Sequence, residues 1–186
     1  MKITYGLSNL YYSKITIGVG GAVTFATPVK LPGGKELSLS PVVDDTKVYA
    51  DDSVYVNISA NQGYDGDLTI YDIPEDFATD ILGMTKDVNG VLVENSEDVR
   101  PQFALLGEFK TDEAKKKRFV LYNCTAGRCD FASQTKEDSI TANELSIPIT
   151  ASPASDTGNV KATIVGTASD PKFAAWFTSV YTGAEK

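Results

Sequence analysis

Residues 40–70, SPVVDDTKVYADDSVYVNISANQGYDGDLTI, alternate between apolar and polar side chains as two β-strands do. The middle of this stretch carries two acidic pairs: Asp44, Asp45, Asp51 and Asp52. We interpret DDTKVYADD as a long polar connection between two strands, giving a projecting hairpin over residues 42–56. Such a hairpin suits an isolated monomer poorly, because its apolar side chains would lack cover. Its acidic side chains either bind a ligand or partner, or repel a negatively charged molecule.

The β-pattern continues on both sides of this stretch. Further strands are predicted in KELSLSPVV, GDLTIYDI, RFVLYNCTA, NELSIPITAS and GNVKATIVGT, and DVNGVLVE contains the hairpin-type turn Asn89-Gly90. Two helices are predicted, over residues 74–83 and 170–180, each with a proline in its first turn. We expect one domain over residues 1–186, with residues 1–35 as an N-terminal arm. The fold class is mainly β, an antiparallel sandwich or barrel with one flanking α-helix, a short C-terminal helix and the projecting hairpin.

Composition excludes several classes of function. The chain has 17 basic and 25 acidic residues, a net charge of −8, which disfavours binding to DNA or to an anionic membrane. It contains no histidine, which removes serine–histidine and cysteine–histidine catalysis and the commonest metal ligand. No apolar run approaches the ~20 residues of a membrane span. We therefore expect no enzyme and no membrane protein.

No cofactor or metal site is expected either. The two cysteines, Cys124 and Cys129, cannot form a zinc site alone, and we expect reduced thiols. The segment from Asn61 to Asp72 echoes a calcium loop, but Gly63 stands where a ligand is needed, and we read Gly63 and Gly66 as turn residues. GVGGAV is not followed by the helix that a dinucleotide loop requires.

Two binding or catalytic alternatives remain open. Asp65 and Asp67 share a strand face at a spacing compatible with the carboxylate pair of a glycosidase, but no cleft is marked in the sequence. A carbohydrate-binding sandwich would need exposed aromatic rings. The single tryptophan, Trp176, falls on the predicted C-terminal helix, which argues against it.

An ordered set of fragments resembles one known family. They are YGLSNLYY, ATPVKLPGGKELSLSP, YADDSVY, GYDGDLTIYDIPEDFATDILGM, DVNGVLVEN, FALLGEF, RFVLYNCTAGR, TKEDSI, LSIPITASP and WFTSVY, from about Tyr5 to Tyr181. Together they resemble the major tail protein, or tail tube protein, of long-tailed siphophages of the phi13 type. One departure is YADDS, where the family more often shows one acid and an amide.

The resemblance implies a structural subunit without enzymatic activity or cofactor. Hexameric rings would stack into a hollow tube that conducts DNA from capsid to host, with inner strands joined into a closed barrel of roughly 24 strands. Implied partners are the subunit itself, the tape measure protein, and the tail terminator and distal tail proteins. DNA would pass without specific binding. The resemblance also implies that the protein assembles in the cytoplasm of the bacterial host and is located in the virion tail. The inner tube of a contractile tail, tailocin or secretion device is the related alternative.

Two residue sets follow as hypotheses. The hairpin would reach the next ring through Asp44, Asp45, Lys47, Tyr49, Asp51, Asp52 and Tyr55. Acids that face the bore and repel DNA would be Glu36, Asp65, Asp67 and Glu144. An acidic wall lets nucleic acid slide, whereas a basic wall would bind it by counterion release.

Overall fold

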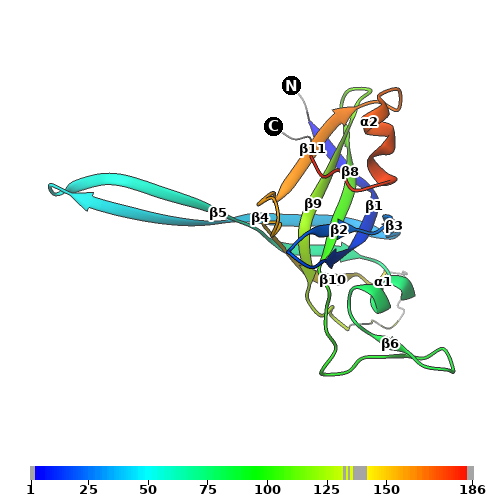
Figure 1. Cartoon of the computed structure of the whole chain (residues 1–186). Helices are drawn as coiled ribbons and strands as arrows, with labels where there is room; N and C mark the ends of the chain where they lie inside the picture. Colours follow the sequence, from blue (N-terminus) through cyan, green and yellow to red (C-terminus); the bar gives the residue numbers. More distant parts are fainter. Residues whose placement is uncertain (1–2, 132, 134, 136–141, 184–186) are drawn as a thin grey trace.

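The described part of the chain forms one nine-stranded antiparallel sheet, a small two-stranded sheet and short helical segments (Figure 1). This computed structural model describes residues 3–131, 133, 135 and 142–183. The strands are β1 Thr4–Ile17, β2 Val23–Phe25, β3 Val29–Lys30, β4 Gly34–Ala50, β5 Ser53–Ile70, β6 Thr85–Lys86, β7 Leu92–Val93, β8 Phe103–Thr111, β9 Lys116–Ala126, β10 Leu145–Ser152 and β11 Lys161–Gly166. The helices are α1 Glu75–Asp80, α2 Pro171–Ala174 and the 3-10 helix η1 Ala175–Phe177.

The large sheet divides at β9 and curls over itself. Its strand order is β2-β1-β8-β9-β10-β5-β4, with β3 added on β1. The first half of β9 pairs with β11, as at Leu121 with Lys161, and the second half pairs with β10, as at Cys124 with Ala151. The prediction of a mainly β antiparallel sandwich is confirmed. The described strands do not close into a barrel.

Both faces of the β8–β9 pair are buried. Leu105 and Leu121 face the main core with β5, β10 and α1, while Leu106 and Val120 face a second cluster under η1. Alternate side chains of a strand point to opposite faces of a sheet, so a strand covered on both sides is apolar throughout. This explains the unbroken run FALL at the start of β8.

The β4–β5 hairpin corrects the expected polar connection. Residues 44–50 do not form a loop, because they continue β4 and pair with β5 up to Ala50 opposite Ser53. The turn is only the two residues Asp51 and Asp52, and both have positive φ, 51° and 58°. Two-residue turns of this hand match the twist of the strands, so the ladder extends to the tip.

Two glycines read as turn residues lie inside β5 instead. Gly63 and Gly66 both belong to strand Ser53–Ile70. Gly63 has φ 114°, and a side chain there would collide with the carbonyl oxygen of Ala151 on β10. The register of β4 against β5 shifts beside it, between Val42 and Val43. Gly63 thus lets β10 approach closely where the hairpin leaves the body.

Both predicted helices form but are shorter than expected. Pro74 precedes α1, which ends at Asp80, and the capping residue Ile81 donates its backbone N–H to the carbonyl oxygen of Phe77. The C-terminal segment begins at Pro171, with Asp170 accepting hydrogen bonds from two backbone N–H groups, and continues as 3-10 helix to Phe177. The apolar side chains of both segments face the core. Phe177 is half-buried, and the others are buried: Phe77, Ile81, Leu82, Phe173, Trp176 and Val180.

The segment expected as an N-terminal arm contains β1. This strand pairs with β8 from Thr4 opposite Thr111 to Lys14 opposite Phe103. Residues 1 and 2 lie outside the described residues. The Asn89-Gly90 turn connects β6 and β7, as the sequence predicts.

A buried carboxylate joins β8, β9 and the C-terminal helices. The Glu108 side chain is fully buried and accepts bonds from Lys116 Nζ and Arg118 Nε, both at 2.8 Å. The Arg118 guanidinium also lies over the rings of Phe173 and Phe177, 3.8 Å and 4.4 Å from their centroids. Arg118 therefore connects the buried charge to α2 and η1.

Replacing Glu108 by glutamine should lower the free energy of unfolding by about 2–3 kcal/mol, because two cations lose a buried partner. The matched control is Glu94→Gln, which removes the ion pair of Glu94 with Arg128 between two half-exposed side chains. That change should cost less than ~0.5 kcal/mol. Urea denaturation measures both, and equal losses would contradict a structural role for the buried cluster.

The effect of Glu108→Gln should depend on pH. Burial by itself raises the pKa of Glu108, but hydrogen bonds from Lys116 and Arg118 outweigh it, and the pKa lies below its ordinary value. The stabilisation is therefore complete above the unfolded pKa of about 4.3 and is lost as pH falls through the folded value. Urea titrations should show a constant difference from pH ~7 to ~5 that shrinks below pH ~4. A difference that persists unchanged at pH ~3 would contradict it.

Candidate assembly surfaces

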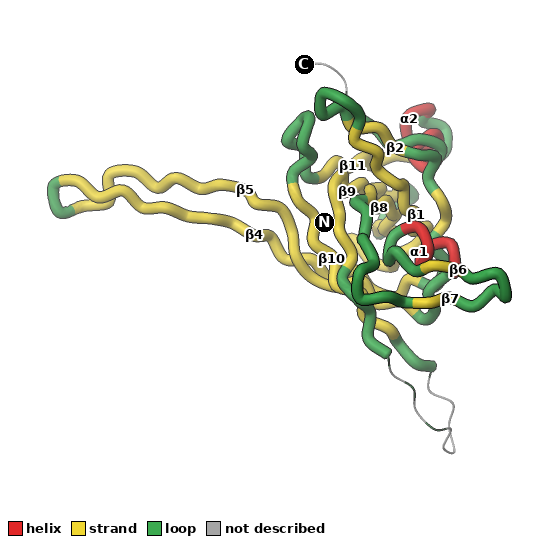
Figure 2. Tube along the Cα trace, turned by 60° about the horizontal axis from the view of Figure 1, so that its bottom comes forward, coloured by secondary structure: helices red, strands yellow, loops and turns green. Residues whose placement is uncertain are grey.

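The β4–β5 hairpin projects from the body with neither face covered (Figure 2). All residues from Pro41 to Tyr49 and from Ser53 to Gln62 are exposed. A two-stranded ribbon is marginally stable in water without a third strand or a covering layer. The hairpin therefore has the character of a surface that awaits a partner.

The two faces of the hairpin differ. Cross-strand partners share a face, so one face carries the pairs Val48 with Val56 and Thr46 with Ile58. The opposite face carries the pair Lys47 with Asn57 and, next to it, Asp45 with Ser59. The hairpin is thus amphipathic although no part of the described body lies against its apolar side.

Each residue of the predicted hairpin set lies on this ribbon. Asp44 is on the apolar face, while Asp45 and Lys47 are on the polar face. The remaining four surround the tip: Tyr49, Asp51, Asp52 and Tyr55. The register shifts between Val48 and Tyr49 place Tyr55 in a bulge, where it is 73% exposed.

A second surface is the outward face of the layer formed by β4, β5 and β10. Asp65 and Asp67 lie there, accepting hydrogen bonds from Thr150 Oγ1 at 2.8 Å and Ser146 Oγ at 3.0 Å. Glu36 stands opposite Thr69 on the neighbouring strand. The alternate side chains, such as Leu68, point into the core. The sheet therefore presents an acidic, hydroxyl-rich face backed by an apolar one.

Glu144 differs from the other three predicted acids. It precedes β10 and forms an ion pair with Lys35 at 2.5 Å. Its charge is therefore partly offset within the subunit. Three of the four predicted acids, Glu36, Asp65 and Asp67, lie on the shared acidic face.

Several strand edges of the described sheet carry no pairing partner. β4 pairs only with β5 and β11 only with β9, and the short strands β2 and β3 pair only with β1. An unpaired edge is a row of free backbone donors and acceptors that can add a strand from another chain. The alternating pattern of the sequence does not indicate which strands form these edges.

Little on these surfaces suggests catalysis or metal binding. Among the described residues, no group of three or more His, Cys, Asp or Glu side chains is placed to hold a metal. Both cysteines are free, and burial raises the pKa of the Cys124 thiol to about 12 and that of Cys129 above its usual value. No described helix is long and apolar enough to cross a membrane.

Comparison with known protein families identifies the family of this chain. The sequence profile of one family, described as phage tail tube protein, matches residues 1–179. The chain belongs to the phage tail tube protein family. A search among curated proteins found no significant match. Tail tube proteins are structural components of the virion tail, which is not a class of enzymes.

The single tryptophan of this tail tube protein is unsuited to stacking on a sugar. Trp176 lies in η1, is buried, and donates its indole N–H to the carbonyl oxygen of Phe119 at 3.2 Å. Its expected place on a helix already disfavours carbohydrate binding. Its burial in the second core cluster gives the physical reason.

The tip of the hairpin should respond to turn chemistry independently of the core. In the pair substitution Asp51→Asn with Asp52→Gly, the new residues accept positive φ more readily. Native-state amide exchange of dilute monomer should slow several-fold at Val48 and Val56 and stay unchanged at Leu105, because the hairpin opens locally. Equal changes at all three amides would show that the hairpin unfolds only with the core.

Proposed function

We propose that this protein is the repeating subunit of a tail tube in which hexameric rings stack into a hollow conduit for DNA. The observation that supports this proposal most strongly is the uncovered β4–β5 hairpin, an amphipathic ribbon that extends far beyond the body of the subunit (Figure 1). A partner related by ring stacking would cover its apolar face. The free edge of β4 would pair with the adjacent subunit within a ring.

The acidic face supports the second part of the proposal. With β4 completing an inter-subunit sheet, the outward face of β4, β5 and β10 would line the bore. Asp65, Asp67 and Glu36 would then repel the phosphates of duplex DNA, which carries one negative charge per ~1.7 Å of axis. The genome could pass without release of counterions and without adhesion.

We also propose partner proteins for the tube and a cellular location for its assembly. The tape measure protein would occupy the bore before DNA does, and terminator and distal tail proteins would cap the ends. Assembly would take place in the cytoplasm of the bacterial host. These proposals rest on resemblance to long-tailed siphophage tail proteins.

Removal of the hairpin should separate assembly from folding. Replacing residues 44–60 by Asn-Gly joins Val43 to Asn61, which face each other, through a turn suited to two strands. The free energy of unfolding should change by less than ~0.5 kcal/mol, because no core side chain is lost. Negative-stain microscopy of concentrated protein should show tubes for the wild type and none for the variant. Tubes of normal appearance without the hairpin would contradict the stacking role.

Reversing the charge of the acidic face should make the tube retain DNA. Asp65→Lys with Asp67→Lys adds positive charge to the proposed bore, and the control Glu113→Lys with Asp156→Lys makes the same change in exposed turns away from that face. DNA retention by assembled tubes should rise at least ~10-fold for the first pair and fall steeply with salt. Equal retention by both pairs would contradict a bore-facing position.

A further inference from the structure

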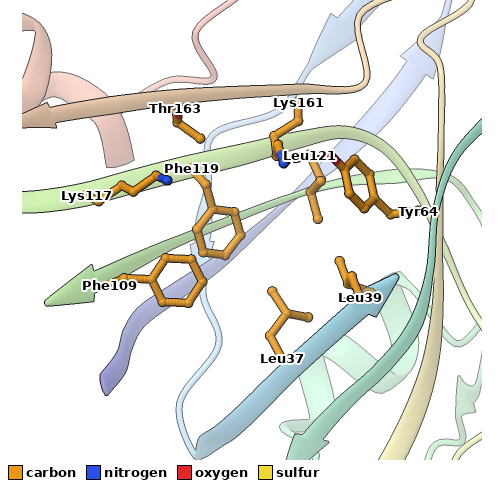
Figure 3. Close-up of a pocket in the computed structure, with 9 residues that line it drawn as sticks. All are labelled: Leu37, Leu39, Tyr64, Phe109, Lys117, Phe119, Leu121, Lys161 and Thr163. Carbon is orange, nitrogen blue, oxygen red and sulfur yellow. Dashed lines mark hydrogen bonds between the residues drawn. The ribbon is translucent and has the colours of Figure 1, made fainter. Parts of the chain in front are cut away.

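A cleft opens at the base of the hairpin, between the free edges of β4 and β11 (Figure 3). Its volume is about 180 Å³. It is lined from five strands by Leu37, Leu39, Tyr64, Phe109, Lys117, Phe119, Leu121, Lys161 and Thr163. The cleft is the place where the two layers of the sandwich fail to meet.

The floor of the cleft is apolar and its rim is cationic. Phe109 and Phe119 stack with centroids 5.0 Å apart, and Leu37 packs beside them against the main core. Lys117 and Lys161 are the two charged residues of the lining. Lys161 Nζ donates to Tyr64 Oη at 2.8 Å, which holds it at the mouth.

The tip of the hairpin has the complementary character. Residues 41–62 carry four aspartates and one lysine. Asp51 and Asp52 form the turn itself, and Tyr55 stands in the adjacent bulge with its ring largely exposed. An acidic loop with a protruding aromatic ring is thus presented at the end of a long ribbon.

We propose that the hairpin tip of one copy docks in this cleft of another copy. The Tyr55 ring enters the apolar floor, and the Asp51–Asp52 turn lies against Lys117 and Lys161. This proposal rests on the proposed stacking of subunits, and it identifies the cleft as the surface that binds the hairpin tip of the neighbouring subunit.

Size and charge both support this occupant. An apolar cavity of about 150 Å³ accommodates benzene, so a cleft of about 180 Å³ holds one phenol ring rather than a whole hairpin. Tyrosine is among the residues that most often anchor interfaces, with an apolar ring and a hydroxyl that can stay at the wet rim. The acidic turn and the two lysines attract and set the orientation of docking.

The geometry requires a second copy. Leu39 lines the cleft and belongs to the same strand that leads away to the turn. From Leu39 to Asp51 the strand advances about 40 Å at ~3.3 Å per residue, so the straight ribbon carries its tip away from its own cleft (Figure 2). A tip-to-base contact is heterologous, and along the proposed stacking axis it repeats from ring to ring. Successive copies should therefore be spaced by no more than about 40 Å.

Disulfide trapping tests the contact directly. Tyr55→Cys and Thr163→Cys are made in separate proteins that also carry Cys129→Ser. The two are mixed at a protein concentration high enough to offset loss of the Tyr55 ring, assembled and oxidised. A covalent dimer should appear on a non-reducing gel. The control mixture replaces Tyr55→Cys by Lys47→Cys, in the middle of the ribbon, and should give at least ~10-fold less dimer.

The outcomes separate this inference from the function on which it rests. Tubes that form without the Tyr55–Thr163 link, or that link equally through position 47, would overturn the docking site and leave the tube function intact. Failure of the wild-type chain to form tubes would overturn the proposed function itself.

A charge-reversal cycle provides an independent readout that folding defects cannot mimic. Asp52→Lys and Lys117→Glu should each raise the critical concentration for assembly at least ~10-fold at low salt, and the double variant should recover most of the loss. Tyr55→Phe should assemble normally, while Tyr55→Ala should raise the critical concentration at least ~10-fold. Absence of recovery in the double variant, with thermal unfolding unchanged, would contradict the pairing.

Discussion

The structure depends on one continuous backbone ladder, in which β4 and β5 stay paired from Gly34 opposite Ile70 to Ala50 opposite Ser53. Its inner part is a layer of the sandwich, with Leu37 and Leu68 facing the core. Its outer part continues without cover. Because the same two strands make both parts, the position of the tip is fixed by the position of the core, and a flexible tether is not needed.

The subunit leaves apolar side chains and strand edges uncovered, and this incomplete burial favours association with other copies. A sandwich with unpaired strand edges, an open cleft and an exposed amphipathic ribbon leaves favourable contacts unmade within one chain. Identical copies can make those contacts for each other, and edges that pair in a ring no longer invite irregular aggregation. The acidic face of β4, β5 and β10 makes no such contact between copies. Its carboxylates suit a solvated surface past which DNA moves without binding.

Sequence periodicity predicted much of this arrangement. Alternation placed Asp65 and Asp67 on one face of a strand, and a proline in the first turn located both helices. Other features depend on long-range pairing that a local pattern cannot reveal. The edge strands, the cleft and the burial of Glu108 between Lys116 and Arg118 are of this kind. The polar appearance of residues 44–52 concealed a strand, because an uncovered ribbon needs no apolar face toward its own body.

The central claim is that copies of this chain complete one another around an acidic channel. Electron cryomicroscopy of the concentrated wild-type protein tests it most directly. The account predicts hollow tubes in which the face bearing Asp65 and Asp67 lines the channel and each β4–β5 hairpin reaches a neighbouring ring. Particles that stay monomeric at high concentration, or tubes with that face on the outside, would contradict it.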